Sequence, residues 1–201
     1  GIFAQYANFG WSPSADDPEV TDRPLLDRWI LSRLCAVESV VDDELQRFDA
    51  TAAARALMDF VSEDVANWYV RLSRARFYEV DGADNRAAFA TLHEVLLVVS
   101  RLLAPFAPFV SDWIHRALAG ESVHLADFTR PDADTRDAAL EAAMAEVRAL
   151  ANLGRAAREE AGIKVRQPLA RLVCVAGSAE PALLDGLVPL LVTELNVKAV
   201  E

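Results

Sequence analysis

Apolar residues recur every three or four positions along most of the first 160 residues of this chain, and alternating β-branched runs are few. This period matches one face of an α-helix, whereas a half-buried strand would alternate apolar and polar residues. The chain has 201 residues, of which 53% are hydrophobic, so it can bury a substantial core. The pattern predicts a mainly α fold.

Five helices are expected in this region, each bounded by capping or breaking residues. Asp49 and Asp84 are predicted N-caps, Pro105 and Pro108 end the third helix, and Gly120 closes the fourth. In the second helix one apolar face is predicted, and Trp68 and Trp113 are both assigned to packing positions. The expected helices lie at about 24–48, 50–78, 84–104, 109–119 and 135–161, and the predicted face holds Leu57, Val61, Val65, Trp68 and Leu72.

The texture of the sequence changes after Gly162. Two β-rich runs, "LARLVCVAG" and "LNVKAV", flank the apolar segment "PALLDGLVPLLVTE". This order predicts two short strands around a helix, as a small, truncated α/β appendage. The first residue is Gly1 and the last residues lack a polar tail, so we expect a piece of a longer protein.

Positive charge is concentrated in "NWYVRLSRARFY", residues 67–78, although the formal net charge is -11. At about 100° per residue, one stripe of this predicted helix holds an amide, two guanidiniums and a phenol. These groups read unpaired RNA bases by hydrogen bonding and stacking. The alternative is a solvated face whose arginines pair with acids of a neighbouring helix. The stripe consists of Asn67, Arg71, Arg74 and Tyr78.

A second basic region covers residues 148–171, with six cationic and two acidic side chains. Residues 16–64 reverse this balance, with thirteen acids against five arginines. Net acidity therefore does not exclude a polyanionic partner on one face. The candidate contacts in the basic region are Arg155, Arg158, Lys164 and Arg166.

Motifs for catalysis, cofactors and metals are missing from the sequence. It contains no P-loop and no Gly-rich dinucleotide fingerprint, and its two cysteines and three histidines have no zinc-site spacing. The separated cysteines suit a reducing compartment, and no apolar run is long enough for a membrane helix. We predict no cofactor or metal in this chain, no membrane, and a cytoplasmic location.

Six blocks, in order along nearly the whole chain, resemble the isoleucyl-tRNA synthetases, a family of class I aminoacyl-tRNA synthetases. The first three also occur in variant form in the valine and leucine enzymes. The last three, and the arginine of "NWYVR", favour isoleucine. The blocks are "DRWILSRL" (27–34), "NWYVRLSRARF" (67–77), "LLAPFAPFVSDWI" (102–114), "ESVHLADF" (121–128), "GIKVRQPL" (162–169) and "ELNVKAVE" (194–201).

The resemblance implies an antiparallel helical bundle of the class I anticodon-binding type at 23–161. Residues 1–22 would lead in from a catalytic region, and 162–201 would begin the appendage. Family members place an N-x-x-x-R pattern against the anticodon loop, which matches Asn67 and Arg71; Arg74 and Tyr78 are added from helical geometry.

The implied partners are isoleucine-accepting tRNA and the rest of the synthetase chain, with no DNA. The parent enzyme would use ATP and Mg²⁺, and the resemblance leaves zinc open for it. The family's HIGH and KMSKS signatures are missing, so the chain alone is predicted to be inactive. Two alternatives stay open: the equivalent domain of a valyl-tRNA synthetase, and a non-enzymatic helical scaffold for protein interaction.

Overall fold

The structure is a computed structural model that describes residues 11–79, 82–175, 177 and 179–201. It divides into two compact units, the first ending at Arg136 and the second beginning at Asp137. The described residues form seven α-helices and no strand. The prediction of a mainly α fold is therefore confirmed, whereas the domain boundaries stated above stay a prediction.

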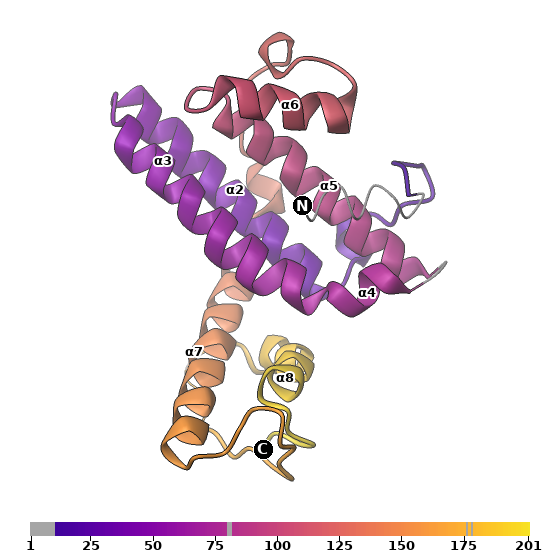
Figure 1. Ribbon diagram of the computed structural model, residues 1–201, viewed down its shortest axis with the longest axis vertical. Coiled ribbons are helices and arrows are strands. Elements are labelled where there is room, and N and C mark those ends of the chain that lie inside the picture. Colours follow the sequence, from indigo (N-terminus) through magenta and orange to yellow (C-terminus); the bar gives the residue numbers. More distant parts are fainter. Residues whose placement is uncertain (1–10, 80–81, 176, 178) are drawn as a thin grey trace. The chain divides into compact units, whose positions relative to one another are not determined.

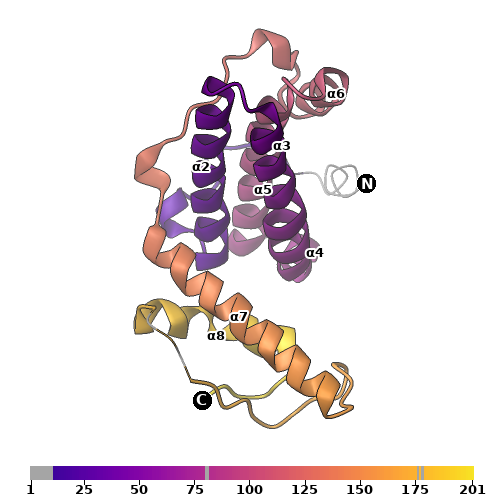
Figure 2. The ribbon, with the colours of Figure 1, turned by 90° about the vertical axis from the view of Figure 1, so that its left-hand side faces the viewer.

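The first unit is a bundle around one long central helix, α2 (Figure 1). Helix α2 packs against α3, η2 and α5, and α5 also contacts α4 and α6. Both views show α2, α3 and α5 side by side (Figures 1 and 2). The elements are η1 (Val20–Asp22), α2 (Leu25–Gln46), α3 (Ala50–Asp59), η2 (Phe60–Val70), α4 (Arg74–Tyr78), α5 (Ala83–Leu103), α6 (Pro108–Ala119), η3 (Val123–Leu125) and η4 (Ala133–Thr135).

Most of the predicted helix boundaries are confirmed by their caps. The Asp49 carboxylate accepts a hydrogen bond from the Ala52 backbone amide at 2.9 Å, and Gly120 ends α6 with a left-handed φ of 78°. The prediction for Asp84 is wrong. Gly82 occupies the N-cap position of α5, and the Asp84 carboxylate instead accepts hydrogen bonds from Arg76.

The predicted helix at 50–78 is not uniformly α-helical, because η2 is a π-helix of 11 residues. A π-helix bonds residue i to i+5, so its buried side chains recur at a longer interval than in an α-helix. The predicted apolar face is confirmed at Leu57, Val65 and Trp68 and is wrong at Val61, which is exposed, while Leu72 is half-buried. The face that is buried contains Leu57, Phe60, Asp64, Val65, Trp68, Tyr69, Ser73 and Phe77.

The core of the first unit lies between α2, the α3–η2–α4 segment and α5. Trp29 and Ile30 of α2 are buried, and Trp68 is buried as predicted. Trp113 is not: its side chain is 73% exposed, and Phe109 one turn earlier is also exposed. Helix α6 instead buries Ser111 and His115, so its polar residues face the bundle and its aromatic residues face solvent.

The second unit consists of α7 (Ala138–Glu160) packed against α8 (Pro181–Leu195). Asp137 caps α7 by accepting from the Leu140 amide at 2.9 Å. The α/β appendage is not seen, because the two β-rich runs form only isolated parallel bridges and no strand among the described residues. Those bridges are Leu169 with Val197 and Leu172 with Val200.

His115 makes the packing of α6 on α5 sensitive to pH. The ring is fully buried, its Nδ1 lies 2.9 Å from Ser100 Oγ, and its Nε2 has no hydrogen-bond partner in the described part of the chain. Burial, followed by the charge of Arg101, lowers the pKa of His115 below its ordinary value. The folded state therefore favours the neutral ring.

We expect this lowered pKa to cost stability in acid. The unfolded chain takes up a proton near pH 6.5 and the folded chain does not, so the free energy of unfolding falls as the pH drops below about 6.5, by up to about 1.4 kcal/mol per pH unit. Urea unfolding of the full chain at pH 7.5 and 5.5 measures this. His115→Gln should reduce the difference between the two pH values, and the exposed His124→Gln should leave it unchanged; the opposite result would contradict the assignment.

Candidate functional site

The four residues predicted to contact RNA in the first unit all have exposed side chains. Asn67 lies on the π-helix η2, and Arg71 follows its last residue. Arg74 and Tyr78 lie on α4, one helical turn apart and therefore on the same face. The surface that we name the η2–α4 face comprises Asn67, Arg71, Arg74 and Tyr78.

Arg71 is held close to Asn67 by local contacts. Its Nε donates to the Asn67 backbone carbonyl at 2.7 Å, and its guanidinium carbon lies 5.7 Å from the centre of the Trp68 ring. The cation–π contact keeps the charged group over the edge of the core without burying it. The Asn67 side-chain amide donates a hydrogen bond to Glu63 Oε2 at 3.3 Å. The amide and the guanidinium are thus presented together at the surface.

Arg76, the third arginine of this run, points into the bundle. Its two terminal nitrogens donate to the two carboxylate oxygens of Asp27 at 2.8 and 2.6 Å, and its Nε donates to Asp84 at 2.9 Å. The Tyr69 hydroxyl donates to Asp27 Oδ1 at 2.7 Å and lies 3.1 Å from the Ala88 carbonyl oxygen. Asp27 and Tyr69 are fully buried. Arg76 therefore ties the end of α4 to α2 and α5.

The ionisation of this network follows from its burial. Burial opposes the charge on Arg76, but the hydrogen bonds and the charge of Asp27 outweigh it and raise the pKa of the guanidinium. Burial, followed by the Asp27 charge, raises the pKa of Tyr69 well above its ordinary value, so the hydroxyl stays a donor. The pairing of arginines with acids of a neighbouring helix thus holds for Arg76, which the predicted stripe did not include.

The second unit exposes two of its four predicted RNA contacts, Lys164 and Arg166. Both lie in the loop that follows α7. Arg155 is half-buried and forms an ion pair with Glu194 of α8, while another of its nitrogens donates to Asn152 at 3.1 Å. The ion pair of Arg155 with Glu194 therefore joins α7 to α8.

Arg158 is not a surface residue, and its assignment as an RNA contact is corrected here. Arg158 is only 4% exposed, and its guanidinium donates hydrogen bonds to backbone carbonyl oxygens. The sequence could not signal this, because arginine is seldom buried. The acceptors are the carbonyls of Lys164, Gln167, Leu195 and Asn196, at 2.6 to 3.2 Å.

Asp112 of α6 holds the start of the loop that follows this helix. The Asp112 carboxylate accepts from the Ser122 hydroxyl and from the Val123 amide, the latter at 3.0 Å. Hydrogen bonds from Arg116 and then Ser122 lower the pKa of Asp112 to about 2. His124 of the same loop is exposed. Asp112, which the sequence pattern did not single out, therefore holds the start of this loop against α6.

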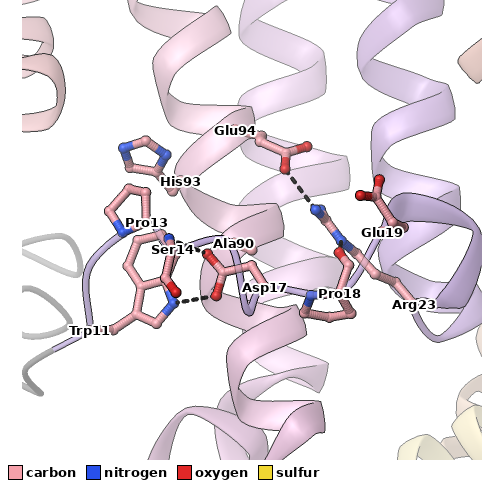
Figure 3. Close-up of a pocket in the computed structure, with 10 residues that line it drawn as sticks. All are labelled: Trp11, Pro13, Ser14, Asp17, Pro18, Glu19, Arg23, Ala90, His93 and Glu94. Atoms are coloured by element: carbon pink, nitrogen blue, oxygen red, sulfur yellow. Dashed lines mark hydrogen bonds and ion pairs between the residues drawn. The ribbon is translucent and has the colours of Figure 1, made fainter.

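A small cavity lies where the segment before α2 crosses α5 (Figure 3). Trp11 stacks on Phe89 with 5.9 Å between ring centres, and its indole nitrogen donates to Asp17 at 3.4 Å. On the other side Arg23 pairs with Glu94 at 2.8 Å. The Arg23–Glu94 ion pair and the stacking of Trp11 on Phe89 therefore fasten this segment to α5.

Comparison with protein families accounts for the helical region as a whole. Residues 27–173 match the family described as the anticodon-binding domain of tRNA ligase. The chain belongs to this family. The match includes the whole η2–α4 face and the loop that carries Lys164 and Arg166.

Curated relatives match nearly the full length of this anticodon-binding domain. It is 50% identical over 206 residues to an isoleucine–tRNA ligase of Thermobifida fusca, a match that covers 98% of this chain and 19% of the relative. The isoleucine–tRNA ligase of Deinococcus radiodurans is 46% identical over 204 residues, covering 99% of this chain and 19% of the relative. The isoleucine–tRNA ligase of Thermus thermophilus is 41% identical over 208 residues, covering 99% of this chain and 20% of the relative. The chain thus spans about one fifth of the length of these relatives.

The described part of the chain holds neither a metal-binding cluster nor a membrane-spanning helix. No group of three or more His, Cys, Asp or Glu side chains there is arranged to hold a metal ion. None of the helices described is long and apolar enough to cross a membrane. Cys35 is buried and Cys174 is half-buried, and both are thiols that take part in no disulfide.

Proposed function

We propose that this chain is the tRNA anticodon-binding part of an isoleucyl-tRNA synthetase, and that the η2–α4 face binds the anticodon loop. The observation that carries the proposal is the identity of 41–50% to isoleucine–tRNA ligases over nearly the whole chain. The exposed amide, guanidiniums and phenol of the face support it, because these groups suit unpaired bases and phosphates.

In the parent enzyme this part would place the tRNA so that its distant acceptor end reaches a catalytic domain outside this chain. ATP and Mg²⁺ would act in that domain, zinc is left open, and the enzyme would work in the cytoplasm. Residues 1–22 would lead in from the catalytic region, 23–161 would form the anticodon-binding bundle, and 162–201 would begin a C-terminal appendage. The exposed Lys164 and Arg166 would bind the tRNA phosphate backbone, and so would the solvent-accessible part of the Arg155 side chain.

Arg71→Ala is expected to weaken RNA binding by about 5- to 150-fold, because one hydrogen-bonded guanidinium contributes about 1–3 kcal/mol. Fluorescence-anisotropy titration of the full chain with an isoleucine anticodon stem-loop measures the change. Asn67→Ala should act in the same direction. Arg55→Ala removes an exposed arginine of α3 outside the face and is the matched control.

The same titration with a valine anticodon stem-loop tests the amino-acid assignment. Preference for the isoleucine loop that is lost in Asn67→Ala and Arg71→Ala supports the proposal. Preference for the valine loop would point to the equivalent domain of a valyl-tRNA synthetase. Equal losses in Arg71→Ala and Arg55→Ala would leave only a general electrostatic surface, and no binding at low salt would contradict RNA binding by this chain.

A further inference from the structure

The loop that follows α7, residues 162–167, has its backbone carbonyls drawn inward by two side chains. Arg158 donates to the carbonyls of Lys164 and Gln167, each at 3.1 Å. The Asn196 side-chain amide donates to the carbonyls of Val165 and Arg166, each at 3.1 Å. Four consecutive carbonyl oxygens are thereby held by residues of α7 and of the end of α8.

Both of these donors are themselves fixed. The Arg158 guanidinium also donates to the Leu195 carbonyl at 2.6 Å, which ties it to the last turn of α8. Asn196 follows that turn as its C-cap, in the left-handed conformation with φ 47°. The loop begins in a matching way, because Gly162 has a φ of 67° and the Ile163 amide donates to the Arg158 carbonyl at 2.8 Å. The loop therefore has one defined shape.

The loop directs positive charge outward. The side chains of Lys164 and Arg166 are exposed while the carbonyls between them are occupied. The sequence between Glu160 and Glu180 contains three cationic residues and no acid. A phosphate backbone is the ligand that such a set of ammonium and guanidinium groups fits. Because the backbone is already ordered, binding would cost little conformational entropy.

We propose that Arg158 and Asn196 are positioning residues, which hold this loop in the shape in which Lys164 and Arg166 bind the tRNA phosphate backbone. This inference rests on the proposed function and adds to it residues that do not touch the RNA. Arg158 thus contributes to binding through the loop, although its own charge is buried.

A double-mutant comparison tests the inference with the full chain and a fluorescently labelled isoleucine-accepting tRNA transcript. Arg158→Gln and Asn196→Gly are each made in the unaltered chain and in the Lys164→Ala/Arg166→Ala variant. Glycine keeps the left-handed backbone at position 196 and removes only the amide. We expect each change to weaken binding about 3- to 10-fold in the unaltered chain and less than about 2-fold in the double-alanine background. The effect should shrink in that background because Arg158 and Asn196 act on binding only through Lys164 and Arg166.

The double-alanine variant should also lower the slope of log affinity against log salt by about two, since it removes two phosphate contacts. Arg171→Ala, which removes an exposed arginine paired with Glu201 outside the loop, is the control for loss of charge. Equal losses in both backgrounds, or no loss in either, would overturn the inference. If Arg158→Gln does not fold, Asn196→Gly decides alone. If the unaltered chain binds no tRNA, the proposed function itself is overturned.

Discussion

Asp27→Ala is expected to destabilise the first unit by about 3–5 kcal/mol, because it removes the fully buried partner of Arg76 and leaves only the more exposed Asp84 beside that partly buried charge. Asp27 is fully buried and accepts from both terminal nitrogens of Arg76 and from Tyr69. Its loss also removes one acceptor of the Tyr69 hydroxyl, which keeps its hydrogen bond to the Ala88 carbonyl. The contact that joins α2 to α4 disappears with it.

Tryptophan fluorescence during urea unfolding measures this effect selectively, since all four tryptophans of the chain lie in the first unit. Asp84→Ala is the matched control, because it removes the other carboxylate bound to Arg76 but at a side chain that is 45% exposed. Its cost should be at most about 1 kcal/mol. Similar costs for the two variants would mean that burial does not set the strength of the network.

Gly154→Val is expected to destabilise the second unit by about 1–3 kcal/mol, because it overfills the contact between α7 and α8. A Cβ atom at position 154 would lie 2.5 Å from Leu195 Cδ1 and 2.9 Å from Cδ2. Leu195 is itself buried, so its side chain has little room to move aside. The absence of a side chain at Gly154 is what lets the two helices approach.

Hydrogen exchange of the α7 and α8 amides, followed by mass spectrometry, measures the change in the free energy of opening of this unit. Ala156→Val places the same side chain on an exposed position of α7 and controls for the helix propensity of valine. Exchange that is equally fast in both variants would contradict the packing role of Gly154.

Local signals predicted much of the fold. The cap at Asp49, the stop at Gly120 and the burial of Trp68 depend on residues close in sequence, and all three are confirmed. The same signals failed where distant parts of the chain decide. Trp113 lies at helical spacing with other apolar residues, yet the side of α6 that packs on α5 is its polar side, with Ser100 bound to His115.

The candidate site was predictable to a similar extent. The exposure of the basic residues at 71 and 74 follows from the sequence pattern, because both share one polar helical stripe with Asn67 and Tyr78. The partner of Arg76 lies 49 residues away in sequence, and nothing local marks Asp27 as that partner. Arg158 was misassigned for the same reason, since its acceptors are backbone carbonyls that come together only in the folded unit.

The π-helix η2 has a consequence for peptide mimics of the η2–α4 face. An isolated segment of this sequence would adopt ordinary α-helical turns if it became helical at all, because π-helical stretches need support from their surroundings. In such a peptide Asn67 and Arg71 would rotate relative to Phe60 and the residues before it. A graft of this face onto a straight helical scaffold would therefore have to carry the buried neighbours on α2 and α5 that hold η2 in its wider form.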